Sequence, residues 1–142
     1  MNQLQLDVYG EVMDSLSLGR RSGLPATPHA WAVQCALMKW LAGNWREPDE
    51  GLWEVRGGRR QFVHSKVMVW VAADRAVRAL EENPELAGDL AGWRALRDEV
   101  HLEVCEKGFD RRRNTSPSPT VRSNWTPPCC SSRASLLPPD DR

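Results

Sequence analysis

The stretch with the clearest chemical potential lies between residues 47 and 60 and reads EPDEGLWEVRGGRR. It holds four carboxylates, beginning with Glu47, and the three nearest Trp53 in sequence are Asp49, Glu50 and Glu54. Two carboxyl groups can hydrolyse a glycosidic bond when one donates a proton to the leaving oxygen and the other acts, ionised, on the opposite face of the sugar. Glu54 suits the acid role because an apolar neighbour such as Trp53 disfavours the charged form. Asp49 and Glu50 would then be supporting groups.

The alternative for the same stretch is an acidic surface loop. Carboxylates that precede a helix are often solvated or paired with nearby arginines, of which Arg46, Arg56, Arg59 and Arg60 are close in sequence. Spacing alone leaves both interpretations open.

A second candidate group follows the loop at His64, Ser65 and Lys66. A nucleophilic role for Ser65 lacks the strand-to-helix turn and the third partner that a hydrolase triad needs. We therefore interpret Ser65 as the N-cap of a helix and His64 as a flanking polar residue. Lys66 either bonds a substrate hydroxyl or points into solvent, and the pattern does not separate the two.

Four helices are predicted to position these groups, over residues 7–18, 28 to about 45, 65–82 and 90–107. Thr27 is a natural N-cap, and Pro28 fits the first helical position. The run VMVWVAADRAV is apolar on nearly all sides, which indicates a helix buried on more than one side. Its β-branched residues leave a strand over 67–71 as the alternative.

The connections between these helices are unequal. Short Gly, Pro and Asn turns join the first helix to the second and the third to the fourth, whereas nearly twenty residues, 46–64, join the second to the third. Long ordered loops between packed helices are more often functional than short ones. The loop is therefore the predicted location of a site.

Tryptophan is the main aromatic residue, with seven copies against one tyrosine and two phenylalanines. Four tryptophans fall within helical patterns and are expected in the core: Trp31, Trp40, Trp70 and Trp93. Trp45 and Trp53 bracket the long loop, and these two are the candidates to meet a ligand.

Composition narrows the class of partner. Nineteen basic and nineteen acidic residues cancel, so no basic field favours nucleic acid. No apolar run approaches the roughly 18–20 residues that span a bilayer, and the N-terminus lacks a signal-peptide pattern, so we expect no membrane partner and a cytoplasmic location. The four cysteines lack metal-ligand spacing, and neither a metal nor a cofactor is predicted.

The loop and the following helix carry a family resemblance. The segment REPDEGLWEVRGGRRQFVHSKVMVWVAADRAVRAL resembles the central part of bacterial glycoside hydrolase family 15 proteins, the glucoamylase and trehalase-like group. The agreement extends upstream through NQLQLDVYGEVMDSL and downstream through WRALRDEVHLEVCEKGFDRRRNT. It covers residues 1 to about 115, and the tryptophan-glutamate step in the loop is its most specific part.

The resemblance implies a part of an all-α (α/α)6 toroid, in which helical hairpins form two rings and long loops at one end build the active site. It implies inverting hydrolysis of terminal α-linked glucose, with Glu54 as the general acid. It places Trp53 and Arg56 near the sugar and Asp7, in a Q-x-D segment, at the pocket floor. Lys66 is a candidate sugar contact on its residue type and place alone. Fungal glucoamylases have a second glutamate directly after the acid.

This chain departs from the family pattern in two respects. Val55 replaces that second glutamate, as in the trehalase-like branch. The family's general base is a glutamate beyond residue 142, and the first helices of the toroid precede residue 1. We therefore expect a central fragment that is inactive alone, because an acid without a base cannot activate water. The alternative is a non-catalytic helical module that binds carbohydrate or another protein.

Residues 116–142 form a predicted separate segment, rich in Ser, Pro and Cys and without periodicity, which is typical of disorder. The letters NWTPPCCSS, back-translated with GC-rich codons and read one base earlier, give ELDAALLLI, an amphipathic pattern that resembles the family after RNT. We hypothesise a frameshift near Ser116 that is restored near Leu136. Resequencing the locus tests this hypothesis.

Overall fold

The computed structural model describes residues 4–25, 27–51 and 59–107. Within these ranges the chain forms helices and no β-strand, so the all-α prediction is confirmed and the strand over 67–71 is wrong. None of these helices is both long and apolar enough to cross a bilayer. The elements are α1 (Asp7–Arg21), α2 (Pro28–Asn44), α3 (Val63–Glu82) and α4 (Leu90–Lys107).

The chain divides into two compact units, Met1–Leu102 and Glu103–Arg142. Of the second unit the structure describes only residues 103–107, and the predicted tail over 116–142 lies outside the described residues. The full toroid and the domain boundary near residue 115 stay predictions. The first unit contains α1 to α3 and most of α4, and it is described below.

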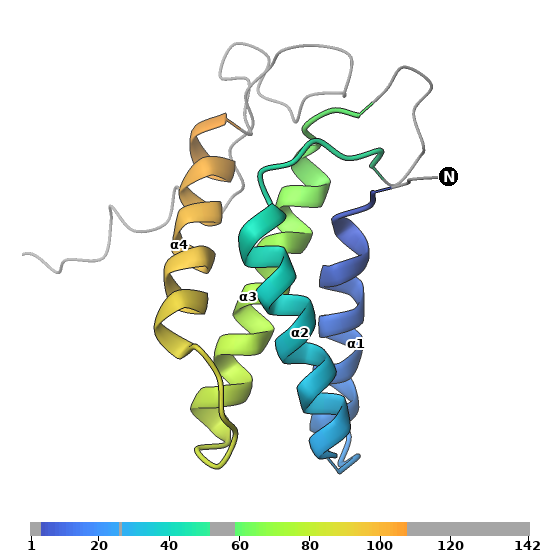
Figure 1. The fold of residues 1–142 in the computed structure, drawn as a ribbon, viewed down its shortest axis with the longest axis vertical. Helices are drawn as coiled ribbons and strands as arrows, with labels where there is room; N and C mark the ends of the chain where they lie inside the picture. Colours follow the sequence, from blue (N-terminus) through green and yellow to red (C-terminus); the bar gives the residue numbers. More distant parts are fainter. Residues whose placement is uncertain (1–3, 26, 52–58, 108–142) are drawn as a thin grey trace, which may run out of the picture. The chain divides into compact units, whose positions relative to one another are not determined.

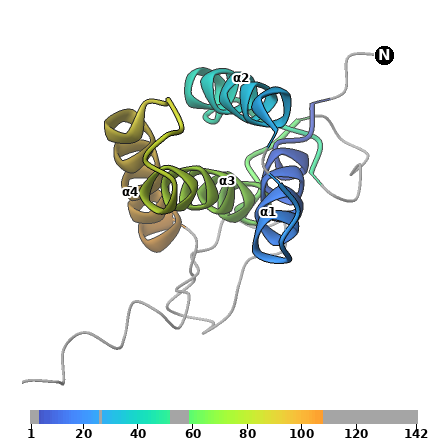
Figure 2. The ribbon, with the colours of Figure 1, turned by 90° about the horizontal axis from the view of Figure 1, so that it is seen from below.

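Helix α3 is the centre of the first unit. Figure 2 shows α1 on one side of α3, α4 on the other and α2 lying across one face. The predicted burial of α3 on more than one side is confirmed, because its buried residues are spread around the helix. They are Ser65, Lys66, Val69, Ala72, Ala73, Asp74, Ala76, Val77, Ala79 and Leu80.

Helices α1 and α3 run in the same direction and make the closest helix contact in the unit (Figure 1). Gly10 allows this approach, since a Cβ atom at Gly10 would lie 2.3 Å from the carbonyl oxygen of Met68. The N-terminal ends of α1 and α3 therefore lie side by side. The described parts of the connection from α2 to α3 lie at that same end, and the two short turns lie at the other.

Helix α1 ends three residues later than predicted, at Arg21 and not near Gly19. The reason is Gly23, which has a φ of 87° and donates its amide to Arg20 O at 2.9 Å. Leu24 donates its amide to Gly19 O at 3.1 Å. These two bonds form a Schellman motif, in which the residue with positive φ is glycine because it has no Cβ.

The N-terminal ends of α2 and α3 differ in how well the sequence predicts them. Thr27 Oγ1 accepts a hydrogen bond from Ala30 N at 3.2 Å, and Pro28 is the first helical residue, which confirms that prediction. Helix α3 begins at Val63, after the extended residue Phe62, so the prediction that Ser65 is an N-cap is wrong. Ser65 lies in the first turn, where its side chain is buried.

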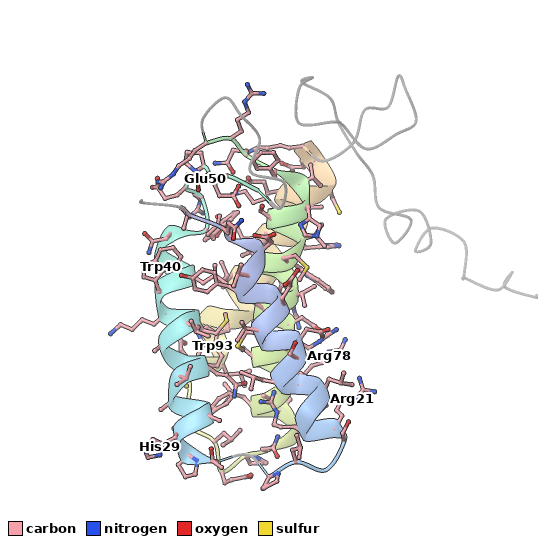
Figure 3. The ribbon with its side chains drawn as sticks, turned by 90° about the vertical axis from the view of Figure 1, so that its right-hand side faces the viewer. Arg21, His29, Trp40, Glu50, Arg78 and Trp93 are labelled. Atoms are coloured by element: carbon pink, nitrogen blue, oxygen red, sulfur yellow. The ribbon has the colours of Figure 1, made fainter. Side chains whose placement is uncertain are left out.

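The tryptophans of the helices follow the core prediction in part. Trp31 and Trp93 are buried and meet edge to face, with ring centroids 6.1 Å apart, and Trp31 Nε1 donates to Ala87 O. Trp40 is 38% exposed, so its core assignment is wrong. It stacks on Tyr9 of α1, with the two ring centroids 4.9 Å apart. Figure 3 shows where Trp40 lies on α2.

Candidate functional site

Polar side chains are buried together where the N-terminal ends of α1 and α3 meet the long connection. Asp7, Asp49 and Ser65 are each 1% exposed, and Lys66 is 5% exposed. Charged residues are rarely buried to this degree unless they are paired or functional. Glu50 lies at the same end of the helices (Figure 3). This end is the candidate active site.

Asp49 ties the base of the loop to the start of the chain. Its Oδ2 accepts a hydrogen bond from Leu6 N at 3.1 Å. Its backbone pairs with Arg60 in both directions, at 2.9 and 2.8 Å, as an isolated antiparallel bridge. The carboxylate therefore acts as a structural anchor next to the candidate site.

Glu50 makes a second anchor beside the first. Its carboxylate accepts from Leu4 N and from Arg59 Nε, and its own amide donates to Leu4 O at 2.9 Å. The hydrogen bond from Leu4 N, opposed by burial and helped by Arg59, lowers the pKa of the Glu50 carboxyl. An acid that stays ionised suits support of the loop and does not suit proton donation.

Lys66 reaches back from α3 to the end of α2. Its Nζ donates to Trp45 O and lies 4.8 Å from the centroid of the Trp45 ring. The solvent-pointing alternative for Lys66 is therefore wrong. Trp45 is 1% exposed, and the Arg46 guanidinium lies 4.4 Å from the centroid of its ring. Contact between Trp45 and a ligand stays a prediction. Contact between Lys66 and a sugar stays a prediction.

Asp7 lies at the first position of α1, where the helix dipole stabilises a negative charge. Its Oδ2 is 4.0 Å from His64 Nδ1 on α3. Among the described residues, Asp7 Oδ1 and Ser65 Oγ have no hydrogen-bond partner. The sequence did not indicate that Ser65 shares a buried location with Asp7. Its only signal was the HSK triplet at the end of the loop.

Three predicted site residues, Trp53, Glu54 and Arg56, lie outside the described residues. The described flanks of that stretch converge, since Asp49 pairs with Arg60 at the end of the unit where Asp7 and Lys66 are buried. In the described ranges, no group of three or more His, Cys, Asp and Glu is arranged to hold a metal ion.

Comparison with known families matches residues 1–123 to glycosyl hydrolases family 15. The chain belongs to this family. A trehalase of Mycobacterium tuberculosis is 39% identical over 111 residues, which are 78% of this chain and 16% of that relative. A trehalase of Thermoplasma volcanium is 32% identical over 115 residues, which are 81% of this chain and 18% of that relative.

The chain therefore spans less than a fifth of the length of these two trehalases. No solved structure matches it significantly.

Proposed function

We propose that this chain carries the general-acid half of the active site of an inverting α-glucoside hydrolase, with trehalose as its substrate. The observation that carries the proposal is family 15 membership together with similarity to proteins named trehalase in a bacterium and an archaeon. Val55, where fungal glucoamylases have a second glutamate, favours trehalose over starch-derived oligosaccharides.

Glu54 is the proposed proton donor to the glycosidic oxygen. In single displacement, a second carboxylate removes a proton from the attacking water on the opposite face of the sugar, and the two carboxyl groups are about 6.5–9.5 Å apart. The proposed sugar contacts are Trp53, Arg56, Asp7 and Lys66. Burial of Asp7 and Lys66 at the end where the 49–60 loop is anchored supports this assignment.

The general base is proposed to lie outside residues 1–142, so the chain alone is proposed to be inactive. The complete protein is proposed to act in the cytoplasm on a neutral disaccharide. The identity of the substrate and the role of Glu54 as the acid are tested separately, because the two parts of the proposal depend on different residues.

The substrate test measures glucose release from trehalose and from maltose by two proteins. One is the 142-residue chain, and the other is a longer protein that continues the family 15 domain on both sides. We expect no release by the chain, and faster release from trehalose than from maltose by the longer protein. Robust hydrolysis by the chain would overturn the fragment proposal, and a preference for maltose would replace trehalose with a maltooligosaccharide.

A further inference from the structure

The two buried polar atoms without a described partner, Asp7 Oδ1 and Ser65 Oγ, require an explanation. Buried polar groups in folded proteins are nearly always hydrogen-bonded, either to protein or to ordered water, because an unmade hydrogen bond costs free energy. Neither atom has that partner within the described ranges. A group that bonds both atoms at once would satisfy the two requirements together.

The register of α1 and α3 places the two side chains at the same level. Gly10 contacts Met68 across the interface, and the two helices run in parallel. Residues three apart lie on the same face of a helix, so Asp7 and Ser65 each lie one turn before that contact. The 4.0 Å separation between Asp7 Oδ2 and His64 Nδ1 agrees with this register.

The chemistry of the two groups is complementary. An ionised carboxylate oxygen only accepts hydrogen bonds, whereas a serine hydroxyl also donates one. No direct bond joins Ser65 to Asp7 in the described structure. A single water molecule can accept from the Ser65 hydroxyl and donate to Asp7 Oδ1, and buried waters typically bridge such polar groups.

We propose that Ser65 is a positioning residue for Asp7, acting through one buried water that links Ser65 Oγ to Asp7 Oδ1. The His64 imidazole lies near the other oxygen, with Nδ1 4.0 Å from Oδ2, so the proposed water bonds the oxygen that His64 does not face. The inference rests on the proposed function where it gives Asp7 a sugar to contact. A carboxylate that is already oriented loses less conformational freedom when it binds substrate.

A double-mutant cycle on the 142-residue chain tests the link without any activity. Urea unfolding is measured for the unsubstituted chain, Asp7→Ala, Ser65→Ala and the double variant. Each single variant should lower the folding equilibrium constant by some factor. We expect the double variant to lower it by a factor about fivefold smaller than the product of those two factors. Ser15→Ala, on an exposed position of α1, is the matched control. The fold-loss in the folding equilibrium constant for Asp7→Ala with Ser15→Ala should equal the product of the two single losses to within about twofold.

A second comparison separates the hydroxyl from general packing. Ser65→Thr keeps the hydroxyl, and Ser65→Val has nearly the same shape without it. We expect the threonine variant to retain the coupling to Asp7 and the valine variant to lose it. The proposal would be overturned if the threonine and valine variants showed equal coupling to Asp7. It would also be overturned if the losses for Asp7→Ala and Ser65→Ala multiplied to the loss of the double variant within twofold.

A high-resolution crystal structure of the unsubstituted chain supplies a readout that needs no variant to fold. We expect one water within hydrogen-bond distance of both Asp7 Oδ1 and Ser65 Oγ, and its absence would overturn the proposal. Glucose release plays no part in these measurements. Failure of the Ser65 inference is therefore distinguishable from failure of the proposed hydrolase activity.

Discussion

Among the loop carboxylates, Asp49 and Glu50 are engaged in anchoring the residues before α1. Both accept hydrogen bonds from that segment, at Leu6 N and Leu4 N. The hydrogen bond from Leu4 N lowers the pKa of the Glu50 carboxyl, which opposes the use of Glu50 as an acid. At the residue scale, Glu54, next to Trp53 in sequence, stays the loop carboxylate proposed for proton donation.

The Glu50 anchor should give a measurable pH dependence. Because the folded-state pKa of Glu50 is lowered, its stabilising contribution is present above the unfolded-state pKa, near 4.3, and is lost as the pH falls through the folded-state value. We expect Glu50→Gln to lower the free energy of unfolding at pH 7 and to have a smaller effect near pH 3. Urea unfolding at both pH values measures this, and an equal effect at both would contradict the anchor.

At the scale of elements, the tight approach of α1 to α3 depends on Gly10. A Cβ at this position would lie 2.3 Å from Met68 O, which is backbone and cannot rotate away. We expect Gly10→Ala to destabilise the fold by about 1–3 kcal/mol in thermal or urea unfolding. Gly43→Ala is the matched control, because a Cβ there meets nothing within 4 Å and alanine is the better helix former. Equal stability of Gly10→Ala and the unsubstituted chain would disprove the close contact.

The elements were predictable from sequence to different extents. Cap chemistry at Thr27 and Pro28 is local, so the start of α2 was predicted to the residue. The end of α1 was missed because Gly19 and Gly23 both fit a helix terminus, and only the observed φ of Gly23 decides between them. Ser65 was misassigned because the extended backbone ends at Phe62, whose side chain cannot cap a helix and so gives no local signal for its start.

At the scale of the first unit, an ion-pair network joins three helices around the buried Asp74. Asp74 Oδ2 accepts from Arg75 at 2.6 Å and from Arg78 at 2.8 Å, and Arg97 of α4 lies 4.0 Å from Oδ1. Arg75 also bonds Asp14 of α1 at 2.6 Å. This network was not predictable from the sequence, because its members are spread over three helices and resemble ordinary surface charges.

Removing the central carboxylate should weaken the packing of the helices. We expect Asp74→Asn to cost about 1–3 kcal/mol of unfolding free energy, since it removes the buried negative charge that faces Arg75, Arg78 and Arg97. Glu81→Gln breaks the exposed pair with Arg94 and should cost at most about 1 kcal/mol. Equal losses of unfolding free energy for the two variants in urea would show that the network around Asp74 stabilises the fold no more than an exposed ion pair does.

The central claim, that Glu54 is the general acid of a family 15 hydrolase, is tested most directly by trehalose hydrolysis with Glu54→Gln in the longer protein that continues the domain on both sides. Glu47→Gln, at an exposed position of the same connection, is the matched control. We predict that Glu54→Gln lowers kcat by about 10²–10⁴-fold while Glu47→Gln leaves it unchanged. Undiminished hydrolysis by Glu54→Gln would contradict the claim.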